Sequence, residues 1–162
     1  MVRVAVFTNC SEVTLFLNGI EIGKEEVFFH KAEFSVPFKE GILTAEGLCG
    51  ESVVTDCVRT TSVPEKLCCE VVEGKTDRVI NVWLEDSNNN MIPDADNTIS
   101  ILLNGAELIG SANGNPNADI GDKNTSVPLF FGKCQFIIRV RKGEKAEVEI
   151  SSGGFETQKI II

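Results

Sequence analysis

The sequence predicts an all-β protein composed of antiparallel β-sandwiches. Three observations lead to this prediction. Apolar and polar residues alternate over short segments along almost the whole chain, Asn-Gly turns interrupt two of these segments, and no window repeats apolar residues at helical spacing over three turns. The predicted strands are roughly five to nine residues long and recur about every 8–12 residues, which is typical of sandwiches.

The strongest turn signal is Asn18-Gly19, which lies between two alternating apolar segments. Both residues tolerate the positive φ angles of a type I′ turn. A two-residue turn pairs Leu17 with Ile20. The next pair on the same face is then Leu15 with Ile22. This apolar face needs further strands to cover it, because a lone hairpin is unstable.

A second Asn-Gly pair, Asn104-Gly105, has the same surroundings. By the same reasoning it predicts a hairpin in which Leu103 pairs with Ala106. Ile101 would then pair with Leu108 on the same face. Two β-units built in the same way are therefore expected.

The other strands follow from alternation. Ala32/Phe34/Val36, Ile80/Val82/Leu84, Phe136/Ile138/Val140 and Ala146/Val148/Ile150 are predicted to face inward. The predicted strands are Arg3–Thr8, Phe28–Pro37, Ile42–Leu48, Ser52–Thr60, Lys66–Val72, Asp77–Glu85, Asn97–Asn104, Ala106–Ala112, Lys133–Arg141, Lys145–Ser151 and Phe155–Ile162.

The segment Thr60–Pro64 is the best linker candidate, because its proline cannot donate to a β-ladder. It predicts two tandem modules: a small β-sandwich over residues 1–62 and an immunoglobulin-like β-sandwich over residues 65–162. The second module has the strand count of an immunoglobulin-like sandwich but lacks the Cys-Trp-Cys signature of antibody domains.

Composition excludes several classes of partner. The net charge is −9, which opposes binding to nucleic acid or to anionic membranes. No apolar run approaches the ~20 residues that span a bilayer. We therefore expect neither nucleic acid nor membrane as a partner.

The chain has six cysteines and one histidine, and no spacing matches a zinc site. We expect the cysteines to be small apolar core residues and a few exposed thiols. A disulfide framework is the alternative, which the irregular spacing and the size of the chain disfavour. Free cysteines favour a cytoplasmic, reducing compartment.

An oxygen-rich segment resembles part of a calcium loop, since Asp86, Asn88 and Asn90 occupy positions 1, 3 and 5 of an EF-hand pattern. Asp94 and Asp96 complete the candidate set. The glycine and the bidentate glutamate of that pattern are missing, and the flanks are strands. A plain turn between strands is therefore the favoured interpretation.

Two surface features are candidate contacts. Trp83 is the only tryptophan, and alternation points it away from the core. It packs against a partner, covers the outer sheet face or stacks on a sugar. Asn113, Asn115 and Pro116 begin a long irregular stretch, Asn113–Val127, and by composition a turn that holds two strands apart is the favoured interpretation of its start. Loops of that length are often functional or in contact with something.

With these residues placed, the chain resembles the C-terminal β-sandwich region of family 2 glycoside hydrolases, in particular bacterial β-galactosidases. The resemblance covers nearly the whole chain. Its most specific pieces are Leu17-Asn18-Gly19, the strand end Asp56–Thr60, Pro93-Asp94-Ala95-Asp96-Asn97 and Asn113-Gly114-Asn115-Pro116.

The resemblance implies a piece of a larger enzyme, so the N-terminus says nothing about a signal peptide of that enzyme. It also implies a non-catalytic accessory region whose partner is the catalytic barrel of the parent chain. No catalytic and no cofactor-binding residue is assigned, because nothing predicts two carboxyls ~5–5.5 Å apart. A carbohydrate-binding module and an immunoglobulin-like adhesin or surface spacer are the alternatives.

Overall fold

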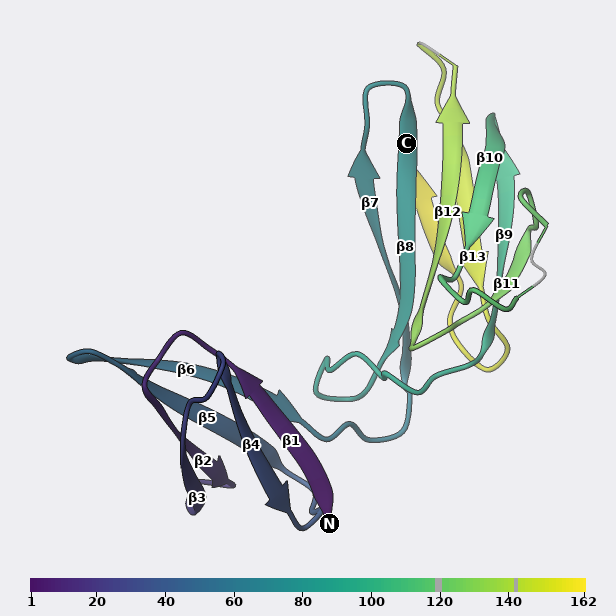
Figure 1. Ribbon diagram of the computed structural model, residues 1–162. Coiled ribbons are helices and arrows are strands. Elements are labelled where there is room, and N and C mark those ends of the chain that lie inside the picture. Colours follow the sequence, from purple (N-terminus) through teal and green to yellow (C-terminus); the bar gives the residue numbers. More distant parts are fainter. Residues whose placement is uncertain (119–120, 142) are drawn as a thin grey trace. The chain divides into compact units, whose positions relative to one another are not determined.

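The computed structural model describes residues 1–118, 121–141 and 143–162. Within these ranges every regular element is a β-strand, and no helix is present that could cross a membrane. The all-β prediction is thus confirmed. The chain divides into two compact units, Met1–Thr60 (unit 1) and Thr61–Ile162 (unit 2), which are described separately below (Figure 1).

Unit 1 consists of a two-stranded and a four-stranded antiparallel sheet, in the orders β1-β4 and β3-β2-β5-β6. Their inner faces enclose a small core of Val13, Leu15, Ala32, Phe34 and Val36. The strands are β1 (Val2–Phe7), β2 (Glu12–Leu17), β3 (Ile20–Glu26), β4 (Lys31–Val36), β5 (Ile42–Cys49) and β6 (Ser52–Arg59).

The Asn18-Gly19 turn joins β2 to β3 as predicted, with φ angles of 53° and 79°. Leu17 does pair with Ile20. The next predicted pair is wrong, because an irregularity between Leu15 and Phe16 shifts the register and places Gly23 opposite Leu15. Gly23 leaves space for Phe34, whose Cδ1 lies 3.2 Å from where a Cβ would stand.

Unit 2 consists of two four-stranded antiparallel sheets, in the orders β10-β12-β8-β7 and β11-β9-β13-β14. The predicted inward sets on β8, β12 and β13 all contribute to the core between them. The strands are β7 (Lys66–Glu73), β8 (Asp77–Glu85), β9 (Thr98–Asn104), β10 (Ala106–Ala112), β11 (Ser126–Pro128), β12 (Lys133–Val140), β13 (Glu147–Ser151) and β14 (Gln158–Ile161).

The predicted second hairpin does not form. β9 pairs with β11 and β13, whereas β10 pairs with β12 in the other sheet. Asn104-Gly105 is therefore a corner at which the chain passes between sheets. Leu103 and Ala106 still pack on the same core, but from opposite layers.

Candidate functional site

Asp86 organises the turn after β8, where the sequence suggested a calcium loop. Its side chain is 1% exposed. Oδ1 accepts hydrogen bonds from the backbone N–H groups of Asn88 and Asn90, both at 2.9 Å, and Oδ2 accepts one from Ser62 at 3.1 Å. The Asn90 amide donates to both oxygens at 3.2 Å. The carboxylate therefore ties residue 62 to the turn.

These donors determine the charge state of the Asp86 carboxyl group. Donation from the backbone of Asn90, with that of Ser62 and Asn88, lowers its pKa to about 2, although burial acts in the opposite direction. Five hydrogen bonds occupy the acceptor sites that a cation would need.

Of the other calcium candidates, Asn88 and Asn90 contact this carboxylate only as hydrogen-bond donors. Asp94 and Asp96 are exposed, as is Asn88. Among the described residues, no three histidine, cysteine or acidic side chains gather where they could hold a metal ion. The geometry fits the turn interpretation of Asp86, which is stabilised by local hydrogen bonds.

Trp83 lies on the outer face of the β10-β12-β8-β7 sheet, opposite in direction to the buried Val82 and Leu84. It is half-buried, and its indole Nε1 donates to Glu85 Oε1 at 2.8 Å. Its cross-strand neighbours are Cys68 on β7 and Lys133 on β12. Its predicted role as a contact stays a prediction.

The loop after β10 is organised by its asparagines. Asn113 Nδ2 donates to the carbonyl of Pro128 at 2.9 Å, and its Oδ1 accepts from the backbone of Asn115 at 3.0 Å. Asn115 accepts from the backbone of Asn117 at 3.0 Å, and Pro116 between them is exposed. Residues 119–120 lie outside the described part of the chain. The stretch is not irregular to its end, because β11 begins at Ser126.

This loop and the sheet beside it enclose a recess of about 250 Å³. Amide side chains dominate its polar lining, and Gln135 donates to Asn81 at 2.7 Å across the strands. Lys133 lines the recess and pairs with Trp83, so it links two of the predicted contact features. The residues that line the recess are Asn81, Ala112, Asn113, Gly114, Lys133, Cys134 and Gln135.

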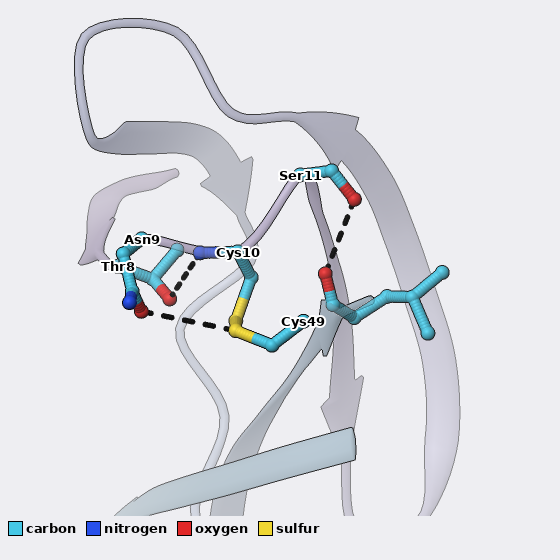
Figure 2. Close-up of a disulfide and its surroundings, with 6 residues drawn as sticks. Thr8, Asn9, Cys10, Ser11 and Cys49 are labelled. Atoms are coloured by element: carbon cyan, nitrogen blue, oxygen red, sulfur yellow. Dashed lines mark hydrogen bonds between the residues drawn. A yellow bond between two sulfur atoms is a disulfide. The ribbon is translucent and has the colours of Figure 1, made fainter. Parts of the chain in front are cut away.

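The expectation that all cysteines are free is wrong for one pair. Cys10 and Cys49 form a disulfide across 39 residues, with their Cα atoms 4.3 Å apart. Figure 2 shows the bond beside two hydrogen bonds of the same segment: Thr8 Oγ1 accepts from the backbone of Cys10 at 3.1 Å, and Ser11 Oγ donates to the Leu48 carbonyl at 3.1 Å. The pairing of β2 with β5 brings the two cysteines together, which spacing alone did not reveal.

The other four cysteines are free thiols. Cys68 and Cys69 are adjacent on β7 and point to opposite faces of it, with Cys69 packed on the core. Burial raises the pKa of Cys134 to about 12 and is the main cause that raises that of Cys68 to about 11. These thiols remain protonated at neutral pH and are poor nucleophiles.

Sequence reasoning missed an open flank on unit 1. The inner faces of β5 and β6 extend beyond the cover of the β1-β4 sheet, and a groove of about 370 Å³ lies between β1 and β6. Val54 is 50% exposed and Val58 63% exposed. One signal was available: Asp56 stands between these two valines on the same strand face, and inward charges mark edge strands.

Comparison with protein families identifies the family to which the chain belongs. Residues 71–161 match the model of the glycoside hydrolase family 2 C-terminal domain 5, and residues 1–55 match a model described as a domain of unknown function (DUF4982). The chain therefore belongs to the C-terminal region of glycoside hydrolase family 2, as the resemblance implied.

Two curated relatives agree with this family. A Formosa agariphila protein named as a β-glucuronidase is 32% identical in an alignment of 152 positions that covers 86% of this chain and 15% of that protein. The β-galactosidase BoGH2A of Bacteroides ovatus is 28% identical in an alignment of 162 positions that covers 91% of this chain and 19% of that protein. The chain thus spans less than a fifth of either relative.

Solved structures have the same fold. A β-glycosidase from Bacteroides vulgatus matches 99% of this chain with a TM-score of 0.87 and 25% identity, over 22% of its own length. A family 2 member from Bacteroides cellulosilyticus matches 99% of this chain with a TM-score of 0.91, at 23% identity and over 24% of its own length.

Proposed function

We propose that this chain is a non-catalytic accessory region of a family 2 glycosidase and braces the catalytic barrel or its rim. The observation that carries the proposal is the match of nearly the whole chain to a C-terminal portion of much longer enzymes. The open apolar flank of unit 1 supports it, because exposed apolar patches mark interaction surfaces. The names of the relatives suggest a β-galactoside or a β-glucuronide as the substrate of the whole enzyme.

Activity measurements test the non-catalytic part of the proposal. The purified chain is expected to hydrolyse neither an aryl β-galactoside nor an aryl β-glucuronide, since two suitably spaced carboxyls are required. The whole enzyme serves as the positive control. Turnover by the chain alone would refute the proposal, provided that it persists through repeated purification.

A second candidate is carbohydrate binding at the recess beside Trp83. Aromatic faces and amide side chains are suited to sugars, and here Asn81, Asn113 and Gln135 lie next to the tryptophan's neighbour Lys133. Calorimetry with galacto- and glucurono-oligosaccharides tests it. Binding should disappear in Trp83→Ala, which removes the neighbour of Lys133, and persist in Phe38→Ala, which removes an exposed aromatic of unit 1.

The cytoplasmic location was expected because the cysteines were expected to be free, and the Cys10–Cys49 disulfide removes part of that reason. We propose instead that the region works in an oxidising compartment, because disulfides persist there and are rare in the cytosol. Mass spectrometry after alkylation of the protein from its native cells tests this. Four alkylated cysteines are expected without reduction and six with it; six in both samples would contradict the proposal.

A further inference from the structure

We propose that the groove between β1 and β6 of unit 1 receives an extended apolar segment from the rest of the parent enzyme, which adds as a strand to the free edge of β1. The inference rests on the proposed accessory function and identifies the surface through which unit 1 is held.

The two sheets of unit 1 differ in width. The β3-β2-β5-β6 sheet has four strands, but only β1 and β4 cover its inner face. Both β1 and β6 are edge strands, and unit 1 is described in full, so no strand within it pairs with their outer edges. A free row of backbone N–H and C=O groups is a template for another strand.

The side chains in the groove call for an apolar occupant. Cross-strand pairing places Val54 beside Gly47 and Val58 beside Leu43, on the face that buries Val13 and Leu15 elsewhere. β6 contributes nothing to the core of unit 1, although its inner residues continue the same apolar face. The groove offers few of the polar groups that would orient a sugar.

Charge and chain length identify the occupant as part of the same enzyme. Asp56 is the only acidic or basic residue that lines the groove. A second copy would bring the same carboxylate and a net charge of −9, which both oppose self-association. More than four-fifths of each curated relative lies outside the part that this chain matches, so a longer polypeptide is available to supply the strand.

Hydrogen exchange tests the inference on the whole enzyme and on the chain alone. In the whole enzyme, amides of Val2–Phe7 and Ser52–Arg59 are expected to exchange about tenfold or more slowly than in the chain alone. Amides of β8, in the closed core of unit 2, are the internal reference and are expected to exchange alike in both. Equal exchange of β1 and β6 in the two proteins would overturn the inference.

Two valines of β6 provide a matched pair of variants. Val58, in the groove, is 63% exposed, and Val53, on the opposite face of the strand, is 60% exposed. In the chain alone, Val58→Asp and Val53→Asp should be tolerated equally. In the whole enzyme, Val58→Asp should release the protection of β1 and β6, whereas Val53→Asp should leave it unchanged. Equal effects in the whole enzyme would contradict the inference.

Sedimentation of the chain alone tests whether a second copy of the chain occupies the groove. A monomer is expected; a dimer that Val58→Asp dissociates would assign the groove to self-association and overturn the inference. Failure of the accessory function gives a different result, namely glycoside turnover by the chain alone. The two proposals can therefore fail separately.

Discussion

Unit 1 and unit 2 each consist of two antiparallel sheets that face each other, but the two units cover their apolar inner faces to different extents. In unit 2 two four-stranded sheets face each other, and the described residues between them include a buried hydrophobic cluster of fifteen. In unit 1 a two-stranded sheet faces a four-stranded one, and the buried cluster has five residues. Small units bury a smaller fraction of their surface and are less stable. The difference predicts that unit 2 is the more stable of the two units and that unit 1 is the more easily unfolded.

Truncation of Phe136 is expected to give the largest difference in stability between the two units. This side chain is fully buried at the centre of unit 2. Phe136→Ala is expected to destabilise unit 2 by about 3–5 kcal/mol, because it removes apolar burial and leaves a cavity. Calorimetry should show two transitions, of which only that of unit 2 shifts, with exposed Phe131→Ala as the control. If both transitions shift together, the units unfold as one body.

Loss of the disulfide should affect the other unit. Replacing Cys10 and Cys49 by serine is expected to destabilise unit 1 by about 2–4 kcal/mol, because the closed loop restricts the unfolded chain. Urea denaturation measures the effect, and Cys57→Ser, at an exposed free thiol, is the control. An unchanged midpoint for unit 1 in the double variant would show that the bond does not support it.

The two Asn-Gly glycines give a smaller, paired test. Gly19 and Gly105 both have positive φ, at 79° and 82°. Gly19→Ala should lower the stability of unit 1 by about 1 kcal/mol, because alanine disfavours a positive φ. The loss should be no larger, since the added Cβ would meet nothing within 4 Å. Gly105→Ala should cost about 2–3 kcal/mol, since its Cβ would lie 2.6 Å from the Lys145 carbonyl oxygen. Equal losses in thermal melts would contradict the corner assigned to Gly105.

Acid is expected to destabilise unit 2 by protonating Asp86, and only at low pH. The folded-state pKa of about 2 lies below the ordinary value of about 3.9. The ionised group therefore contributes stability that is complete above the ordinary value and is lost as pH falls through about 2. Thermal melts of Asp86→Asn should depend less on pH between 5 and 2 than those of the unchanged chain. Parallel curves would exclude this role.

At Asn18-Gly19 the local sequence predicted the turn but not the strand register beyond it. The turn itself was predicted, because its two residues tolerate positive φ. The register shift between Leu15 and Phe16 was not predicted, since the space that Phe34 of β4 needs beside Gly23 is not encoded near the turn. In the same way, the disulfide needed the pairing of β2 with β5 before residues 10 and 49 became neighbours.

The sequence by itself determined that the chain is all-β, and which residues of most strands face inward, because side chains alternate with a period of two. Only the tertiary structure decided which strands pair. At Asn104-Gly105 the local signal allowed a hairpin, but β9 and β10 each bury their apolar faces better in opposite sheets around one core. The open flank of unit 1 was likewise decided by the unequal widths of two sheets, a property of the assembled strands that no single segment carries.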